Sequence, residues 1–425
     1  MQPFRFVHAA DLHIDSPFKG LRGIADDVAT RLRASTFEAF RNLIGLCIQE
    51  RADFLVIAGD VYDGADRGIR AQRRFREGLT ELAEHGIQTF VAHGNHDPLD
   101  TWNSRSVLPE MTHIFGPEPE WAEARRGGNG ELLAHIQGVS YPTRVVEDNL
   151  ALQFGPPPNG YDGFSIGVLH CNVGGNSNHD NYAPCTLEDL ASVGLDYWAL
   201  GHVHSPAERV LRERAPMVVY PGNTQGRHPN EPGPRGAMLI DVNAAGETRS
   251  RFVPLDVVRW ETLRIDIAGL PGNDALIDRV TGEIESVRAA AAGRDLVCRV
   301  QLTGRGPLHQ TLREPGNLDE LREEIHLQAA TGSGWTWVDD VRNETRPELD
   351  LEVLSSRDDF VGEVLRRAKS LDLESCQELL AEVFRSRNTG PDRPLERLDS
   401  TQVQAWVQDA QWYLAETLGS GGNDS

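Results

Sequence analysis

The run Asp53-Phe-Leu-Val-Ile-Ala-Gly-Asp60 decides how the rest of the chain is interpreted. Its apolar middle, residues 54–58, predicts a strand buried on both faces, and Gly59 allows a sharp turn at its end. In open α/β sheets, ligands bind outside the carboxyl ends of the strands. Asp60 therefore stands where a ligand is expected, and its two carboxylate oxygens can bridge two metal ions.

Four other apolar runs also end on His, Asp or Asn. They are Asp11-Leu-His13, Gly94-Asn-His-Asp97, Leu169-His170 and Gly201-His-Val-His204. Five such endings in one chain indicate a shared site. Carboxylate and amide oxygens mixed with imidazole suit Mn, Fe or Zn better than Ca. Two such ions about 3.5–4 Å apart acidify a bridging water and bind developing oxyanions, which is the chemistry that phosphoester hydrolysis needs.

The bulk properties are those of a multidomain globular protein. At 425 residues the chain exceeds what one hydrophobic core usually serves, so we expect two or three domains. No apolar run is long enough to span a bilayer, and the N-terminus lacks a signal-peptide pattern. The five cysteines are scattered and odd in number, which predicts free thiols in a reducing cytoplasm.

Charge gives a weaker indication about the substrate. The formal net charge of -22 counts mildly against tight non-specific nucleic-acid binding, which needs Lys and Arg, but does not exclude it. One local basic cluster offers either a contact for phosphates or an ordinary solvated helix face. It consists of Arg67, Arg70, Arg73, Arg74 and Arg76.

Strands alternate with helices in the first part of the chain and antiparallel strands follow, which predicts two packed sheets covered by helices. The expected fold class is α/β, with a two-sheet β-sandwich core over residues 1–255. Residues 256–350 show a β-α-β-α-β order typical of a small α+β capping domain. Residues 351–425 are mostly helical in pattern. The Pro- and Gly-containing stretch 117–130 predicts a loop, and 102–109 a short helix.

The five endings together resemble the calcineurin-like metallophosphoesterases, whose pattern is DxH, GDxxD, GNHD, a lone His and GHxH. All five blocks occur here in order, which is far more specific than one GNHD alone. By this resemblance, each metal has four ligands and Asp60 is shared. The first metal is bound by Asp11, His13, Asp60 and His204, and the second by Asp60, Asn95, His170 and His202.

The resemblance also assigns a catalytic residue that is not a ligand. His96 faces the scissile phosphate and assists the leaving oxygen, with Asp97 orienting it. Asp63 is either a group that supports the metal site from a distance or a turn residue, and we favour the turn. We interpret Tyr62 as a packing residue. A buried histidine taken singly more often makes a structural hydrogen bond than binds metal. That interpretation stands for the histidines without a motif partner, which are His8, His85, His93, His113 and His135.

Two longer stretches narrow the resemblance. The segments Phe6-Val-His-Ala-Ala-Asp-Leu-His-Ile-Asp-Ser-Pro-Phe18 and Tyr220-Pro-Gly-Asn-Thr-Gln-Gly-Arg-His-Pro-Asn-Glu231 are similar to the SbcD-type DNA-repair exonucleases, most closely their YhaO-like bacterial branch. The resemblance implies a Mn-dependent nuclease, with Fe or Zn as the other candidate metals, in which a metal-bridging hydroxide attacks in line. Its expected substrates are DNA ends, single strands or hairpins. The implied partners are an SMC-like coiled-coil ATPase, on which the C-terminal helices dock, and a second copy of the chain.

Two other function classes stay open. A phosphatase or small-molecule phosphodiesterase would use the same metal site. Protein phosphatases of the superfamily carry GDxxDRG and GNHE, whereas Gly64 and Ala65 follow Asp63 here and the third block is GNHD. A non-catalytic scaffold for the ATPase would not need a complete ligand set.

Two features outside the motifs have alternative interpretations. Arg227 and His228 either contact the substrate phosphate or form a structural turn. Near the C-terminus, apolar residues recur at helical spacing, and this apolar face packs either on the chain's own cap or in a partner's groove. They are Trp406, Trp412, Tyr413 and Leu418.

Overall fold

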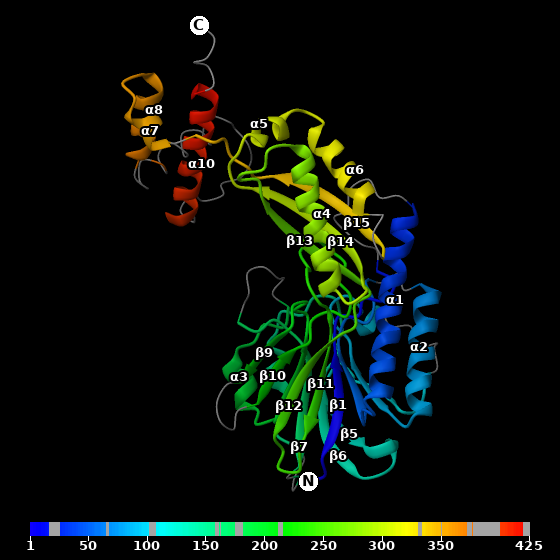
Figure 1. Ribbon diagram of the computed structural model, residues 1–425. Coiled ribbons are helices and arrows are strands. Elements are labelled where there is room, and N and C mark those ends of the chain that lie inside the picture. Colours follow the sequence, from blue (N-terminus) through cyan, green and yellow to red (C-terminus); the bar gives the residue numbers. More distant parts are fainter. Residues whose placement is uncertain are drawn as a thin grey trace. The chain divides into compact units, whose positions relative to one another are not determined.

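A computed structural model describes most of the chain (Figure 1). The described residues are 1–16, 26–64, 68–101, 108–157, 161, 163–174, 182–210, 216–329, 334–349, 351–371, 376 and 400–419. The chain divides into two compact units. One is Met1–Leu263 with Gly282–Arg299 and His326–Asp340, and the other is Arg264–Thr281 with Val300–Ile325 and Val341–Ser425.

The first sheet has six strands in the order β12-β11-β1-β2-β3-β4. Strands β1 to β4 pair in parallel, while β11 and β12 add an antiparallel edge beside β1. The strands are β1 (Phe4–Ala9), β2 (Phe54–Ala58), β3 (Gln88–Ala92), β4 (Thr112–Ile114), β11 (Gly236–Val242) and β12 (Thr248–Pro254).

The second sheet also has six strands, in the order β5-β6-β7-β8-β10-β9. Its four central strands are parallel, and both edge strands are antiparallel to their neighbours. The strands are β5 (Glu120–Arg125), β6 (Leu132–Gly138), β7 (Phe164–His170), β8 (Tyr197–Gly201), β9 (Ala207–Val210) and β10 (Met217–Tyr220).

The two sheets pack face to face around an aromatic core, as predicted. Phe6 meets Tyr197 with ring centroids 5.2 Å apart. In β2, Phe54 and Val56 belong to this inter-sheet core, while the alternate residues Leu55 and Ile57 pack in a second core on the other face. The strand ending at Asp60 is therefore buried on both faces.

Helices cover the outer faces of the sheets. The helices α1 (Asp26–Gln49) and α2 (Ile69–Glu84) lie side by side (Figure 1) and pack on the first sheet. The helix α3 (Leu187–Ser192) begins with a capping box at Thr186, in which the Thr side chain and Asp189 satisfy each other's backbone N–H groups. The described residues also include the 3₁₀ turns η1 (Leu99–Thr101), η2 (Arg126–Gly128) and η3 (Leu150–Gln153).

A third, three-stranded sheet follows in the order β13-β14-β15. It is parallel, because Asp295 N donates to Val257 O at one end of the first pair and Ile267 N donates to Thr303 O at the other. This confirms the β-α-β-α-β order. The elements are β13 (Val258–Asp266), α4 (Asn273–Ala290), β14 (Asp295–Thr303), α5 (Leu308–Arg313), α6 (Asn317–Ala329) and β15 (Thr336–Asn343).

The chain ends in helices, again as predicted. They are α7 (Leu351–Ser356), α8 (Phe360–Lys369) and α10 (Ser400–Gly419), which pack on one another. Trp412 is only 6% exposed, with the Arg305 guanidinium 3.9 Å from its ring centroid. Trp406 and Tyr413 are 48% and 63% exposed. The apolar residues of this helix therefore lie on two faces, one packed within the chain and one open.

One prediction of local structure is wrong. The stretch 117–130 contains a strand, β5, which pairs with β6 at the edge of the second sheet. Its sequence Glu-Trp-Ala-Glu-Ala-Arg is poor in β-branched residues, so intrinsic propensity gave no signal and pairing with β6 determines the strand. The helix predicted at 102–109 falls largely outside the described residues. No helix in the described part of the chain is long and apolar enough to cross a membrane.

Candidate metal centre

Five strands deliver the predicted residues to one place. Asp11, Asp60 and Asn95 follow β1, β2 and β3 of the first sheet, His170 ends β7, and His202 follows β8 of the second. Parallel neighbouring strands end at the same edge, so the order of each sheet already brings these residues close. Two contacts join the loops. Asp11 N donates to Gly59 O at 3.0 Å, and His170 Nδ1 lies 2.9 Å from Ala58 O across the two sheets.

The backbone at this edge is strained. Asp11, His13, Asp60 and His202 have φ angles of 51°, 42°, 54° and 95°. The left-handed region is unusual for residues with a Cβ, and such residues cluster at functional sites. Four of the predicted ligands therefore adopt a conformation that only the surrounding structure can hold.

Four side chains form the first half of the cluster. His13 Nε2 lies 3.3 Å from His204 Nε2 and 3.7 Å from Asp60 Oδ2. His204 Nε2 in turn lies 3.7 Å from Asp11 Oδ1. These atoms converge on a common volume, which is the arrangement expected of the first metal position.

The second half shares Asp60. His170 Nε2 lies 3.4 Å from Asp60 Oδ2 and 3.0 Å from Asn95 Oδ1. The His202 ring lies 5.2 Å from the His170 ring, centroid to centroid, and its backbone N–H donates to Asp11 at 3.1 Å. The structure thus brings all seven predicted ligands together.

Glycines in the motifs allow this close approach. A Cβ on Gly94 would lie 2.3 Å from Asp60 Oδ1 and 2.8 Å from His170 Nε2. On Gly201 it would lie 1.8 Å from Ala58 O. Any larger residue at either position would displace the cluster or separate the sheets.

The charges of the cluster fit divalent cations. Asp11 and Asp60 are buried carboxylates, which need a positive partner. Burial and the nearby positive charges, Arg227 foremost, lower the pKa of His13 well below its ordinary value, so its lone pair is available. Burial would lower the pKa of His170, but the negative charge of Asp60, foremost, raises it to about 9. The same negative charge favours a divalent cation beside this imidazole.

His96 is oriented by Asp63, the last residue of the GDxxD block, and not by the residue that the resemblance assigned to this role. Its Nδ1 lies 2.6 Å from Asp63 Oδ1, and Asp63 Oδ2 accepts from Ser16 Oγ at 2.7 Å and Arg227 Nη1 at 3.3 Å. Burial would lower the pKa of His96, but the hydrogen bond to Asp63 and the charges of Asp60 and Asp63 raise it. Of the two interpretations of Asp63, these contacts support the supporting role near the metal site and not the favoured role as a turn residue.

Asp97 does not orient His96, contrary to the expectation from the resemblance. Its carboxylate is fully buried and accepts from Val61 N and Gly94 N, both at 2.9 Å, while His93 Nδ1 lies 3.1 Å away. Because these partners hold the turns after β2 and β3, Asp97 fixes the loops that carry the cluster.

A carboxylate that sequence reasoning missed is Glu231. Its Oε1 lies 2.5 Å from His204 Nδ1, on the side of the ring away from the cluster. Burial would raise the pKa of Glu231, but the hydrogen bond and charge of His204, followed by Arg227, hold it at about 2. The available signal was topological, because Glu231 follows β10, which pairs with β8 beside the GHxH turn.

The histidines without a motif partner make structural contacts, as predicted. His8 Nδ1 lies 3.0 Å from Tyr197 Oη, His93 pairs with Asp97, His113 with Glu120, His135 with Glu123, and His85 with Glu81 O.

Tyr62 is buried against Phe75, which confirms a packing role. In the basic cluster, Arg73 and Arg74 both pair with Glu77, while Arg67 lies outside the described residues.

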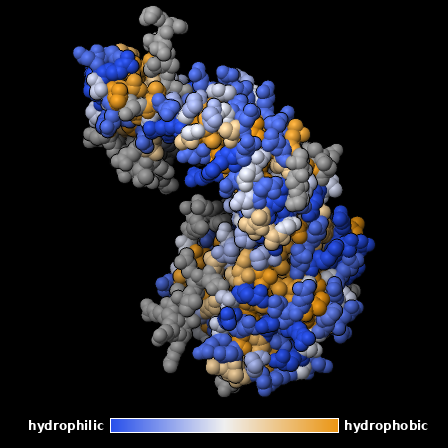
Figure 2. Space-filling model, in the orientation of Figure 1, coloured by the Kyte–Doolittle hydropathy of each residue, from blue (hydrophilic) through white to orange (hydrophobic). Residues whose placement is uncertain are grey.

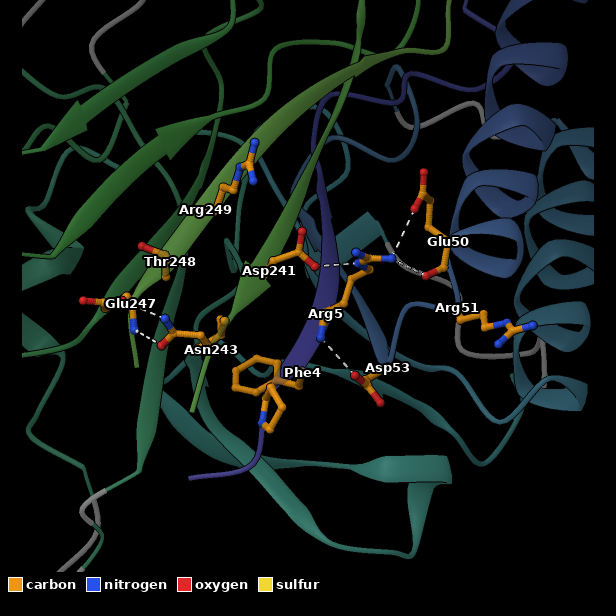
Figure 3. A pocket seen from close by; sticks show the side chains of 12 residues that line it. Phe4, Arg5, Glu50, Arg51, Asp53, Asp241, Asn243, Glu247, Thr248 and Arg249 are labelled. Atoms are coloured by element: carbon orange, nitrogen blue, oxygen red, sulfur yellow. Dashed lines mark hydrogen bonds and ion pairs between the residues drawn. The ribbon is translucent and has the colours of Figure 1, made fainter. Parts of the chain in front are cut away.

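A hollow of about 650 Å³ lies elsewhere, at the amino end of β1 (Figure 3). There Arg5 reaches Asp241 and Glu50 with its guanidinium, at 2.6 and 3.2 Å, and its backbone N–H donates to Asp53 at 2.9 Å. The hollow is remote from Asp11, which follows the other end of the same strand, and it contains none of the predicted site residues.

Two sheets whose strand ends gather these ligands define a metal-dependent phosphoesterase. Residues 4–206 match the calcineurin-like phosphoesterases and residues 260–346 the middle domain of the metallophosphoesterase YhaO. The chain is 33% identical to the uncharacterized metallophosphoesterase YhaO of Bacillus subtilis over 414 residues, 97% of each chain. It therefore belongs to the calcineurin-like metallophosphoesterases, in the YhaO branch.

More distant relatives carry names that refer to DNA repair or to a nuclease. The DNA double-strand break repair protein Mre11 of Thermoplasma acidophilum is 21% identical over 405 residues, which are 91% of this chain and 100% of that protein. One subunit of the SbcCD nuclease of Bacillus subtilis is 23% identical over 293 residues, 60% of this chain and 72% of that protein.

Proposed function

We propose that this metallophosphoesterase is a DNA nuclease subunit that hydrolyses phosphodiesters with two bound divalent ions, Mn²⁺ in preference to Fe or Zn. The observation that carries the proposal is the extent of the similarity to the Mre11 protein of Thermoplasma. That similarity reaches 91% of this chain, well beyond the residues that supply metal ligands. A general phosphatase would need only the catalytic sheets.

The two ions would be held by the residues that the structure gathers, namely Asp11, His13, Asp60 and His204 on one side, and Asp60, Asn95, His170 and His202 on the other. When bound, such ions supply a nucleophile at neutral pH and neutralise phosphate charge. The chain's own contribution to bond cleavage comes from His96. Its Nδ1 is engaged by Asp63, which leaves Nε2 as the atom that can donate a proton to the leaving oxygen.

Arg227 is well placed to assist. Its guanidinium donates to Ser16 Oγ at 2.7 Å and lies 3.3 Å from Asp63, beside His96. A cation there favours an approaching phosphodiester and restrains the carboxylate that orients His96. Both alternatives foreseen for this residue, substrate contact and structural support, are thus compatible with one position.

The C-terminal helices support the proposal of an ATPase partner. Besides Trp406 and Tyr413 on α10, Val353 on α7 is 59% exposed and Phe360 at the start of α8 is 72% exposed. Figure 2 shows hydrophobic surface in the region of α7 and α8. Exposed apolar residues that gather on one helical segment are typical of a binding surface. We propose that this segment docks on the coiled coil of an SMC-like ATPase in the cytoplasm, and that the chain forms a homodimer.

The proposal is tested with the full chain loaded with Mn²⁺. Linear duplex DNA labelled at one 3′ end, a DNA hairpin and a single strand should each be cut, and EDTA should stop the reaction. His96→Ala should bind Mn²⁺ normally but cut each of the three DNA substrates far more slowly than the wild-type chain. Hydrolysis of a small phosphodiester without any DNA cleavage, with the partner ATPase present, would favour a small-molecule phosphodiesterase. Absence of both activities in the metal-loaded chain would favour a scaffold.

A further inference from the structure

The loop after β10 holds His204 by its main chain and by its side chain. His204 O accepts hydrogen bonds from Asn223 N at 3.2 Å and from Arg235 Nη1. His204 Nδ1 lies 2.5 Å from Glu231 Oε1. The other ring nitrogen, Nε2, faces Asp11 and the remaining ligands. One loop thus fixes both the position and the ring orientation of this histidine.

Glu231 is fully engaged by these contacts. Its second oxygen, Oε2, accepts from Arg227 N at 2.7 Å and Asn223 Nδ2 at 3.0 Å. The side chain is only 13% exposed, so its carboxylate is largely shielded from water. One carboxylate oxygen of Glu231 therefore contacts the His204 ring, and the other accepts hydrogen bonds from the loop.

We propose that Glu231 is a positioning residue that sets the affinity of the first metal position and leaves the second unaffected. The inference rests on the proposed two-metal function. A carboxylate that accepts the Nδ1–H of a histidine fixes the tautomer whose Nε2 lone pair is free, and it raises the basicity of that nitrogen. In the proposed ligand sets His204 belongs only to the first position. Its Nε2 lies 3.3 Å from His13 Nε2 and 3.7 Å from Asp11 Oδ1, whereas the neighbours of His170 Nε2 are Asn95 and Asp60.

Replacing Glu231 with Gln preserves the shape of the side chain but replaces one of its two acceptor oxygens with an NH₂ donor. If the amide oxygen stays toward His204, the NH₂ group meets the N–H donors of Arg227 and Asn223. If the amide flips, its NH₂ group donates to Nδ1, which forces the proton onto Nε2, the atom that must bind metal. Either orientation weakens His204 as a ligand, and neither touches Asn95 or His170.

The test measures Mn²⁺ binding to the metal-free full chain by titration calorimetry, with bound metal counted by mass spectrometry. Losing such a partner of a ligand typically lowers metal affinity about 10–100-fold. Glu231→Gln should show that loss at one position and wild-type affinity at the other. Glu120→Gln, which removes another Glu–His contact at 3.2 Å between Glu120 and His113, is the matched control and should bind as wild type.

The outcomes separate the two proposals. A wild-type chain that takes up fewer than two ions would overturn the two-metal centre and, with it, the role of Glu231. Two ions in the wild type with unchanged affinities in Glu231→Gln would overturn only the role of Glu231, as would equal weakening of both positions. Glu231→Asp, which withdraws the carboxylate by one methylene, should give the same selective loss and provides the answer if the Gln variant does not fold.

Discussion

The contact between His96 and Asp63 allows a quantitative test. At 2.6 Å, with Asp63 Oδ1 accepting from His96 Nδ1 and the carboxylate mostly buried, this is a charge-assisted hydrogen bond. Such bonds contribute about 1.5–3 kcal/mol. Because about 1.4 kcal/mol changes a rate tenfold, Asp63→Asn should reduce kcat by about 10–150-fold if the bond orients and charges the acid in the transition state.

The loss of kcat in Asp63→Asn is compared with the loss in His96→Ala. General acid catalysis contributes about 10²–10⁴-fold, so His96→Ala should lose more than Asp63→Asn. If Asp63 acts through His96, the double variant should be no slower than His96→Ala alone, because residues that act as a unit are not additive. Ser16→Ala removes a neutral hydrogen bond to the same carboxylate and should have a smaller effect than Asp63→Asn.

The assay compares two leaving groups under single-turnover conditions. A p-nitrophenyl phosphodiester hardly needs protonation of its leaving group, whereas an alkyl phosphodiester such as DNA does, so the loss should be larger for the alkyl substrate. Metal content should stay normal, since Asp63 is not among the proposed ligands and approaches His13 at Nδ1, at 4.0 Å, whereas His13 Nε2 faces His204 and Asp60. Additive losses in the double variant, or loss of metal in Asp63→Asn, would refute the reasoning.

Three further predictions concern the metal cluster, the core and the terminal helices. Asp60→Asn removes the shared carboxylate, so bound metal should fall below two per chain and hydrolysis should vanish; full occupancy with normal turnover would contradict the bridging role. Burial lowers the pKa of His8 in the folded chain to about 3. Between about pH 6.5 and pH 3 the unfolded chain therefore binds a proton at His8 that the folded chain does not bind. The free energy of unfolding falls as the pH is lowered through this range. From pH 7.5 to pH 5.5 the unfolding free energy should fall by about 1.4 kcal/mol because of His8. In His8→Gln, without metal, this part of the pH dependence should disappear; an unchanged pH dependence would show that His8 is not responsible. Trp412→Ala should destabilise the unit that contains α10 by about 3 kcal/mol in urea denaturation, because Trp412 is buried. Changing the exposed Trp406 and Tyr413 to Ser should leave the stability of this unit unchanged and abolish co-purification with the proposed ATPase. The reverse pattern would exclude the exposed face of α10 as the docking surface.

Much of the fold was predictable because each decisive strand carries its own signal. The run before Asp60 is continuously apolar, and β2 is buried on both faces as that pattern requires. That the candidate ligands gather followed from the resemblance and from the topology, since the parallel strands of each sheet end at one edge and His170 and Asn95 stand at two strand ends. By contrast, β5 was missed because an edge strand needs no apolar alternation.

The residues that support the cluster were harder to predict than the ligands. Asp97 follows His96 directly and so appeared to be its partner, yet its carboxylate bonds Gly94 N and Val61 N. Asp63 occupies that role instead, because the turn after Asp60 returns to the GNHD turn, where Gly64 N donates to His96 O at 3.1 Å. Adjacency in sequence does not decide such pairings, since the contacts depend on how two separate turns meet.

A left-handed backbone recurs at four of the predicted ligands. Each non-glycine residue in that region costs about 1–2 kcal/mol, and Asp11, His13, Asp60 and His202 all adopt it. A fold keeps such residues only where other contacts determine the backbone. Here Asp11 N and His13 N donate to the carbonyls of Gly59 and Asp60, so the turn after β1 is held against the turn after β2. The strained residues therefore reach the cluster as parts of one hydrogen-bonded layer, in which backbone contacts between the two turns set the positions of the ligands.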